Sequence, residues 1–237
     1  MIEVENFKTY GWESAIRGMR NPMNSWDKSD SLFGRNLGIP YSQSNPVMLI
    51  NETGYEMYIG DNDLALMKRL RAGGSDDRKY LRQIFVSCDI TAPLYWWKEM
   101  DQYKVSTVTN SCSTMHKIAS KEFTMEDFSF EKLSDEYQYV DALGYTDSPD
   151  ISPYILGKLI CEVLNIYRKK YLETKDKNYW WQMIQLLPSS YNQKRTWTAN
   201  YEVLTNIYHA RKNHKLDEWH TFCDAIEKLP YAKDLII

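Results

Sequence analysis

Residues 84–100 read IFVSCDITAPLYWWKEM, and this stretch decides the fold class. Its first half carries apolar side chains at every second position, which is the period of a half-buried β-strand: Ile84, Val86, Cys88 and Ile90. The segment Thr91-Ala92-Pro93 then leads into a helix, since proline is tolerated in the first helical turn. We expect that helix to run from Leu94 to about Tyr103. A strand that passes directly into a helix predicts a mixed α/β fold.

Helical patterns dominate the remainder of the chain. Asp61-Asn62-Asp63 offers N-caps for a helix that Gly73-Gly74 closes. Further helices are expected at residues 155–171, 179–187, 196–211 and 216–229. The first of these four carries one broad apolar face, made of Leu156, Leu159, Ile160, Val163, Leu164 and Tyr167.

Three stretches carry weaker signals. Residues 106–113 permit a strand or an extended loop, because they are rich in Ser and Thr. Residues 19–41 are expected to form loops, and residues 124–150 helix pieces and loops. No repeat, linker or change of composition divides the chain. We therefore expect a single domain over residues 1–237, of the α/β (α+β) class, with helix dominating the C-terminal half.

Composition excludes several classes of protein. The chain has 237 residues, of which 43% are apolar and 26% charged, so it can bury a full core. Its formal net charge is −3, whereas proteins that bind nucleic acid polymers usually carry a basic excess. No stretch approaches the roughly 18 apolar residues that a membrane helix needs. The N-terminal residues do not resemble a secretory signal. We expect a cytoplasmic protein.

The cysteines and histidines do not form a metal-binding pattern. Cys88, Cys112, Cys161 and Cys223 are widely spaced and are expected to be reduced thiols. Three of the histidines lie near the C-terminal end, but two ligands on one helix need a spacing of three or four. His209 and His214 are five positions apart, so the sequence predicts no metal site.

The polar run at residues 110–114, Asn-Ser-Cys-Ser-Thr, allows two interpretations. It could hold a nucleophile or grip a phosphate through hydroxyl and backbone N–H groups. It could equally be an ordinary polar turn with one thiol, and the residues alone favour this second reading. We do not expect covalent attack by Cys112.

The expected helix at residues 196–211 has an unusual face. At about 100° per residue, four side chains share one side of the helix: Asn200, Leu204, Ile207 and Arg211. A buried polar group costs about 1–3 kcal/mol when it has no partner, so the Asn and the Arg need partners. The partner could belong to the protein or to a ligand.

Two segments together resemble the flavin-dependent thymidylate synthases, the ThyX family. Residues 92–97, APLYWW, are similar to the strand-to-helix entry of that family. The C-terminal match is stronger: Leu187-Pro188, Trp197-Thr198-Ala199-Asn200, Asn206 and Arg211 follow the family's LP…WT-x-N…N…R run without a gap. The resemblance extends weakly over residues 60–237 and is poor in the first 50 residues.

The resemblance implies a ThyX-like mixed sheet with long helices, assembled as a homotetramer with FAD bound between subunits. It implies transfer of a methylene group from methylenetetrahydrofolate to the nucleotide dUMP, with NADPH as reductant. In this assignment Arg211 is the catalytic residue that stabilises charge on the uracil. The cofactor-binding residues are Gln102, Tyr103, Lys104, Asn200, Asn206 and His214. The nucleotide-binding residues are Glu99, Ser111, Cys112, Ser113 and Thr114.

The chain departs from the family signature at its charged positions. Gln102, Tyr103 and Lys104 replace the family's Arg-His-Arg triplet, and Cys112 replaces its Ser. Asn110 stands at an acidic position, while Thr114 and Ile184 stand at basic ones. A bidentate guanidinium binds a phosphate far better than Gln does. Lys98, Lys104 or Arg195 could replace the missing cations.

These departures predict that dUMP methylation is weak or absent. The alternative is a non-catalytic or repurposed homologue that binds flavin or a nucleotide, or serves as an assembly protein. A third interpretation is a helical interaction protein without a small-molecule site. Flavin absorbance of the purified protein separates the third interpretation from the first two.

Overall fold

The computed structural model describes residues 2–38, 48–49, 54–137 and 151–237. The chain divides into two compact units. We call residues 91–102 and 111–195 the hairpin unit, and residues 2–90, 103–110 and 196–237 the sheet unit. Within the described part of the chain, no helix has the length and apolar character needed to cross a membrane.

The described strands form two sheets. The larger has the order β1-β5-β7-β6, from β1 (Glu3–Tyr10), β5 (Phe85–Pro93), β7 (Asn192–Asn200) and β6 (Val108–Ser111). The smaller has the order β2-β4-β3, from β2 (Leu32–Arg35), β4 (Tyr55–Tyr58) and β3 (Met48–Leu49), and is antiparallel. Most residues of the larger sheet belong to the sheet unit, and its central strands run on into the hairpin unit.

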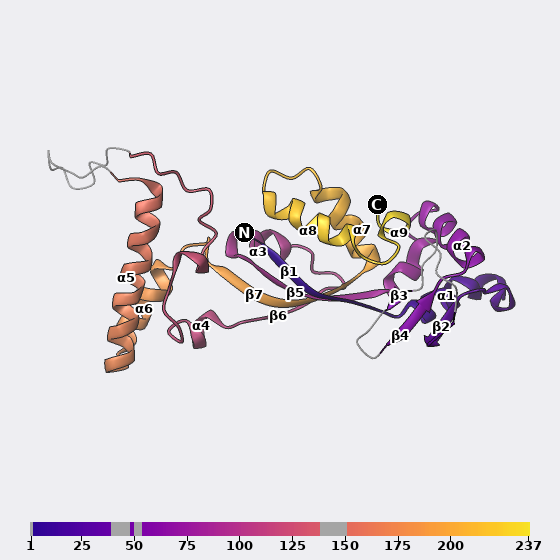
Figure 1. The fold of residues 1–237 in the computed structure, drawn as a ribbon, viewed down its shortest axis with the longest axis horizontal. Coiled ribbons are helices and arrows are strands. Elements are labelled where there is room, and N and C mark those ends of the chain that lie inside the picture. The colour runs from indigo at the N-terminus through magenta and orange to yellow at the C-terminus, as the bar shows by residue number, and fades with distance from the viewer. Residues whose placement is uncertain (1, 39–47, 50–53, 138–150) are drawn as a thin grey trace. The chain divides into compact units, whose positions relative to one another are not determined.

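Helices pack around the sheets of the sheet unit. They are α1 (Trp12–Arg20), α2 (Asp61–Ala72), α7 (Tyr201–Arg211), α8 (Asp217–Glu227) and α9 (Ala232–Leu235), with 3₁₀ turns η1 (Asn21–Met23), η2 (Trp26–Lys28) and η3 (Arg78–Gln83). Figure 1 shows α7, α8 and α9 gathered together, and α8 contacts both α7 and β1. Trp12 packs edge-on against Tyr201, with ring centroids 5.2 Å apart.

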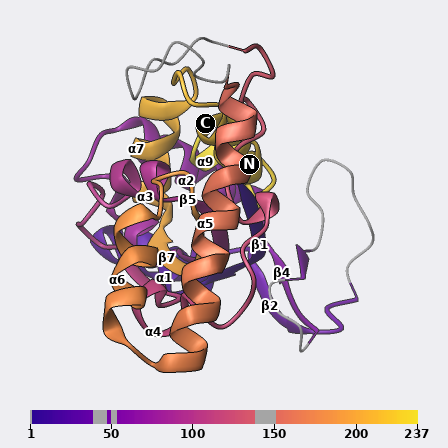
Figure 2. The ribbon, with the colours of Figure 1, turned by 90° about the vertical axis from the view of Figure 1, so that its left-hand side faces the viewer.

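The hairpin unit is built around two long helices. It contains α3 (Leu94–Met100), α4 (Thr114–Lys117), the 3₁₀ turn η4 (Met125–Asp127), α5 (Pro153–Thr174) and α6 (Lys177–Leu186). Figure 2 shows α5 and α6 running side by side, and they pack extensively. Their shared core contains Leu164 and Met183, together with Phe123 and Phe128 from the preceding segment.

The strand-to-helix prediction is confirmed. Val86, Cys88 and Ile90 on β5 are buried while Phe85 is exposed, as the two-residue period predicts. Pro93 precedes the first residue of α3, which ends at Met100 rather than at Tyr103. The predicted helices at residues 61–72, 155–171, 179–187 and 216–229 correspond to α2, α5, α6 and α8. The mixed α/β fold with a helix-dominated C-terminal half is therefore confirmed.

The helix predicted at residues 196–211 is wrong in its first five residues, which end strand β7. Trp197 and Ala199 are buried, and the alternating Thr196 and Thr198 reach β5. The Thr196 hydroxyl donates to Asp89 Oδ1 at 2.6 Å, and the Thr198 hydroxyl lies 3.4 Å from Ser87 Oγ. This two-residue alternation and the cross-strand bonds favour the strand. Helix α7 begins only at Tyr201.

Two further predictions need correction. Only part of the broad apolar face of α5 lies in the core: Leu164 is buried, whereas Leu156, Leu159 and Val163 are exposed. The segment 19–41 is not only loop, because it includes the turns η1 and η2 and strand β2; its residues 39–41 lie outside the described residues. Of residues 124–150, the described part contains η4, and residues 138–150 lie outside it.

Candidate functional site

Arg211 ends helix α7 and lies in an aromatic cluster of the sheet unit. We call Tyr103, Arg211, His214 and Trp219 the Arg211 cluster. Arg211 Nε donates a hydrogen bond to the Tyr103 hydroxyl at 2.9 Å. The guanidinium carbon lies 4.6 Å from the centre of the Trp219 ring and 5.6 Å from that of Tyr103. Such contacts between a cation and ring faces are attractive, so they hold the guanidinium in one orientation.

The remaining members of the cluster support this arrangement. The rings of Tyr103 and Trp219 meet edge to face with centroids 6.3 Å apart, and Trp219 is fully buried. The backbone N–H of His214 donates to the Arg211 carbonyl at 2.9 Å, and its Nδ1 accepts from Leu216 N at 3.2 Å. His214 therefore shapes the turn between α7 and α8. Arg211 itself is half-buried, so the cluster presents a fixed positive charge at the protein surface.

The two predicted cofactor-binding asparagines do not share a helix face with Arg211. Asn200 is buried and is the N-cap of α7, where its Oδ1 accepts from Val203 N at 3.0 Å. That carbonyl oxygen already satisfies a helix N-terminus. Asn206 is exposed and lies five positions before Arg211, which corresponds to about 140° around the helix. Asn200 is therefore not part of the helix face predicted from the sequence, whereas Leu204, Ile207 and Arg211 of that face lie on α7.

The three residues at the Arg-His-Arg positions differ in their exposure and in their hydrogen-bond partners. Tyr103 belongs to the Arg211 cluster, and its backbone carbonyl accepts a hydrogen bond from the Thr107 hydroxyl. Gln102 is exposed, and its Nε2 donates to the carbonyl of Lys98 at 3.2 Å. Lys104 is also exposed. Of the three, only Lys104 carries a charge.

Cys112 lies in an extended segment of the hairpin unit whose backbone is already hydrogen-bonded. Its N–H donates to the Lys194 carbonyl at 2.9 Å, and its own carbonyl accepts from Gln193 Nε2 at 2.7 Å. The next residue, Ser113, is the N-cap of α4, and its Oγ accepts from His116 N at 3.1 Å. Cys112 is thus hydrogen-bonded to strand β7 and Ser113 caps α4, so both residues have structural partners.

Ser111 and Thr114 complete the predicted nucleotide-binding run. Ser111 is exposed and Thr114 is half-buried, as is the more distant Glu99. Asn110 is exposed, and Ile184 packs against the core of the hairpin unit. Ile184 therefore fills apolar space at a position where the family carries a cation.

Arg195 is the cation connected to the Cys112 segment through Gln193. Its guanidinium carbon lies 4.2 Å from the centre of the Trp97 ring. Nε donates to Gln193 Oε1 at 2.9 Å, and Nη1 forms an ion pair with Asp101 at 2.9 Å. Asp101 already balances the charge of Arg195. In this arrangement Arg195 is therefore a poor substitute for the cations that are missing at Thr114 and Ile184.

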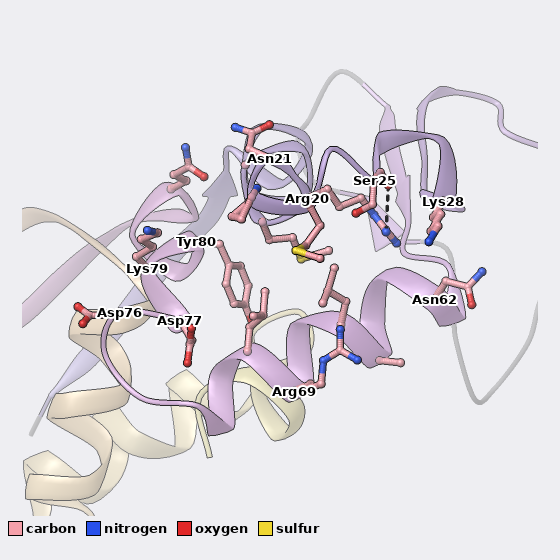
Figure 3. Close-up of a pocket in the computed structure, with 18 residues that line it drawn as sticks. Arg20, Asn21, Ser25, Lys28, Asn62, Arg69, Asp76, Asp77, Lys79 and Tyr80 are labelled. Atoms are coloured by element: carbon pink, nitrogen blue, oxygen red, sulfur yellow. Dashed lines mark hydrogen bonds between the residues drawn. The ribbon is translucent and has the colours of Figure 1, made fainter.

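The sequence did not indicate a pocket of about 1200 Å³ in the sheet unit. It is lined by residues of α1, η1, α2 and η3. Figure 3 shows Lys28 and Asn62 at one end and Asp76 and Asp77 at the other. Arg69 and Lys79 also line the pocket, so its lining carries charges of both signs and selects no single ligand charge.

The buried centre beside this pocket is neutralised within the protein. Arg20 Nε pairs with Asp63 Oδ1 at 2.6 Å, and both side chains are almost fully buried. Burial alone would raise the pKa of Asp63, but hydrogen bonds from Ser31 and Ser29 and the Arg20 charge lower it. This pair joins residues 43 positions apart, which no sequence spacing could predict.

Known proteins resemble this chain in structure but not detectably in sequence. No protein-family model matches the sequence, and no curated protein does so. Among solved structures, thymidylate synthase X (ThyX) from Helicobacter pylori with FAD and dUMP gives a TM-score of 0.62 at 16% identity, covering 100% of this chain and 97% of that one. A second structure of flavin-dependent thymidylate synthase ThyX from Helicobacter pylori, complexed with FAD and dUMP, gives 0.61 at 16% identity, covering 99% and 97%. At such identity the likeness establishes the fold alone: this chain has a ThyX-like fold.

Proposed function

We propose that this chain is a flavin-dependent thymidylate synthase-like protein that binds FAD and a nucleotide, and in which methylation of dUMP is weak or lost. The observation that carries the proposal is the fold match along the whole chain to ThyX structures solved with FAD and dUMP. The gapless run from Leu187-Pro188 to Arg211 supports it independently, because it comes from the sequence.

The residues assigned to FAD have suitable chemistry. Gln102, Lys104 and Asn206 are exposed and carry N–H donors, which phosphate and hydroxyl oxygens accept. These donors fit the polar parts of FAD, although one cation replaces the two arginines of the family triplet. Asn200 contributes less than the resemblance implies, because its carbonyl oxygen caps α7. When bound and reduced by NADPH, the flavin would supply the hydride for the reaction.

Arg211 is the residue that we assign to catalysis. Its guanidinium is oriented by Tyr103 and Trp219, so it loses little orientational freedom when a negative charge develops beside it. On a bound pyrimidine it would stabilise negative charge on a carbonyl oxygen. This role needs neither Cys112 nor a metal.

The nucleotide-binding residues explain why we expect weak activity. The Cys112 N–H and the Ser113 hydroxyl oxygen already form hydrogen bonds within the protein. Arg195 is paired with Asp101. Ser111 is exposed and Thr114 is half-buried, so their hydroxyl groups are the assigned groups that can reach a nucleotide. Loss of one positioned electrostatic contact commonly costs about a hundredfold or more in rate.

The same observations favour an alternative function. If the chain binds flavin or a nucleotide without turnover, it acts as a repurposed binding protein or an assembly protein. We propose in either case a cytoplasmic homotetramer. All four cysteines are free thiols, which suits a reducing compartment.

The test combines binding and turnover. FAD is titrated into the purified protein and followed by its absorbance and fluorescence. The protein is then supplied with FAD, NADPH, methylenetetrahydrofolate and dUMP, and dTMP is measured. We expect saturable FAD binding with turnover well below about 1 s⁻¹, the lower end of ordinary enzymes. Turnover above that value would refute weak activity, and absence of FAD binding would refute the flavin assignment.

A further inference from the structure

Arg195 is held in place by three contacts within the hairpin unit. Its guanidinium carbon lies 4.2 Å from the centre of the Trp97 ring, and its Nε donates to Gln193 Oε1 at 2.9 Å. Its Nη1 lies 2.9 Å from Asp101 Oδ1. The side chain of Arg195 is 13% exposed, whereas that of Asp101 is 45% exposed. The cation is therefore fixed, and the carboxylate that neutralises it lies at the surface.

Gln193 connects this cation to the segment that we assign to the nucleotide. Its Nε2 donates to the Cys112 carbonyl at 2.7 Å, and its Oε1 accepts from Arg195. The oxygen and nitrogen of an amide group are bonded to the same carbon, so Arg195 Nε lies no farther than about 8 Å from that carbonyl oxygen. Charges at this separation still interact when one of them is largely buried. A phosphate bound beside Cys112 would therefore be influenced by the charge state of the Arg195 pair.

The carboxylate of Asp101 is not explained by the helix that it follows. Asp101 is the C-cap of α3, and the C-terminal end of a helix carries a partial negative charge that disfavours a carboxylate. The carboxylate instead pairs with Arg195. Its effect at this position is thus to cancel the charge of a cation next to the nucleotide segment.

We propose that Asp101 is a specificity-determining residue that makes this site accept an uncharged nucleoside in preference to its 5′-phosphate. The inference rests on the proposed nucleotide site and names the class of ligand for it. A phosphate monoester carries a charge of about −1.5 to −2 at pH 7 and would have to compete with Asp101 for Arg195. A nucleoside carries no such charge, so it leaves the pair between Asp101 and Arg195 intact.

The other groups assigned to the nucleotide also suit a nucleoside. Ser111 is exposed and Thr114 is half-buried, and their hydroxyl groups can exchange hydrogen bonds with the hydroxyl groups of a sugar. Glu99 is half-buried. A carboxylate accepts a hydrogen bond from a sugar hydroxyl, whereas it repels a phosphate. The polar groups of this segment therefore match a sugar better than a dianion.

Two exposed lysines flank the Cys112 segment, Lys117 on α4 and Lys194 on β7. An exposed ammonium is strongly hydrated, so its pairing with an anion contributes little. Both lysines are unchanged by a substitution at Asp101. A comparison of wild type with an Asp101 variant therefore isolates the effect of the carboxylate.

The first experiment titrates deoxyuridine and dUMP separately into the FAD-loaded protein and follows the heat of binding. We expect wild type to bind dUMP no more tightly than deoxyuridine. Asp101→Asn keeps the size of the side chain and removes its charge, which frees Arg195 for a charge-assisted hydrogen bond to the phosphate. The dissociation constant for dUMP should then fall about tenfold or more, while that for deoxyuridine stays within about twofold of wild type. The matched control is Glu162→Gln, which removes an exposed carboxylate on α5 of the same unit and should change neither constant.

The second experiment identifies the cation that receives the phosphate. Adding Arg195→Gln to Asp101→Asn should return dUMP binding to about the wild-type level. Deoxyuridine binding and circular dichroism of the same double variant report whether the segment is still folded. A double variant that is folded and still binds dUMP tightly would show that Arg195 is not the phosphate ligand, and would overturn the inference.

Three further results would overturn it. They are a wild-type protein that binds dUMP more tightly than deoxyuridine, an Asp101→Asn variant that does not tighten dUMP binding, and a protein that binds neither ligand. FAD binding together with a preference for dUMP would overturn this inference and leave the proposed function intact. Absence of FAD binding would refute the flavin assignment, whereas the preference for deoxyuridine is then measured in the same titrations without FAD.

Discussion

Asp63→Asn should destabilise the sheet unit far more than the loss of one charge at the surface. Asp63 is fully buried on α2. Its Oδ1 accepts from Arg20 Nε at 2.6 Å, and its Oδ2 accepts from Ser29 and Ser31 hydroxyls at 2.7 Å each and from the N–H groups of Asp30 and Ser31 at 3.1 Å each. The carboxylate thus joins α1, α2 and the segment before β2.

The magnitude follows from this geometry. Asn has nearly the same size, but its NH₂ group cannot accept a hydrogen bond. In one orientation the NH₂ faces Arg20, and in the other it faces the donors of Ser29, Asp30 and Ser31. Either orientation leaves the buried Arg20 guanidinium without its counter-charge. Removing one partner of a buried ion pair costs about 3–5 kcal/mol, a large part of the 5–15 kcal/mol that usually stabilises a domain.

The effect should depend on pH in a defined direction. The pKa of Asp63 is lowered in the folded state, against burial, by Ser31, Ser29 and Arg20. A carboxyl group with a lowered folded pKa contributes stability above its unfolded pKa, near 3.9, and that contribution is lost as the pH falls through the folded pKa. We therefore expect the difference between wild type and Asp63→Asn to be full at pH 7 and to shrink below about pH 4.

The assay is urea unfolding followed by circular dichroism at pH 7 and at a series of acidic pH values. Asp234→Asn is the control, because Asp234 pairs with Lys68 at 2.7 Å on the surface of the same unit. Exposed pairs contribute about 0–1 kcal/mol. If Asp63→Asn costs no more than Asp234→Asn, or if its cost does not change with pH, the argument from burial and pairing is refuted.

Three further predictions concern the candidate site and the core of the hairpin unit. Arg211→Ala should weaken binding of FAD or dUMP by about 2–4 kcal/mol in calorimetric titrations, because it removes a fixed cation. The control Lys212→Ala removes an adjacent exposed cation and should leave binding unchanged. Equal effects of the two variants would reject the assignment of Arg211. Cys112→Ser should leave turnover and FAD binding within about twofold of wild type in the dTMP assay, and abolished turnover would show that the thiol reacts. Leu164→Ala should lower unfolding stability by about 2–5 kcal/mol, since Leu164 is fully buried; a loss below about 1 kcal/mol in urea titrations would contradict its place in the core.

Part of the candidate site was readable from the sequence. The resemblance singled out Arg211 and Tyr103 as site residues, and the structure brings these two together across 108 positions. It also suggested Asn200, whose side chain instead caps a helix. Capping depends on where the preceding strand ends, and the sequence pattern did not locate that end correctly. Trp219 was missed altogether, because its packing on Arg211 follows from how α8 returns along α7.

By itself, the sequence determined the elements whose pattern is local. The alternation in β5 and the apolar spacing in α5 are properties of neighbouring residues, and each element formed where its period predicted it. The tertiary structure decided which segments pair with or pack against these elements. Residues 196–200 became a strand because β5 offers Ser87 and Asp89 as partners more than 100 positions away. The apolar face of α5 divided into a buried side and an exposed stripe because α6 packs beside only part of it. Periodicity reports that a face is apolar, whereas the path of the chain determines what covers it.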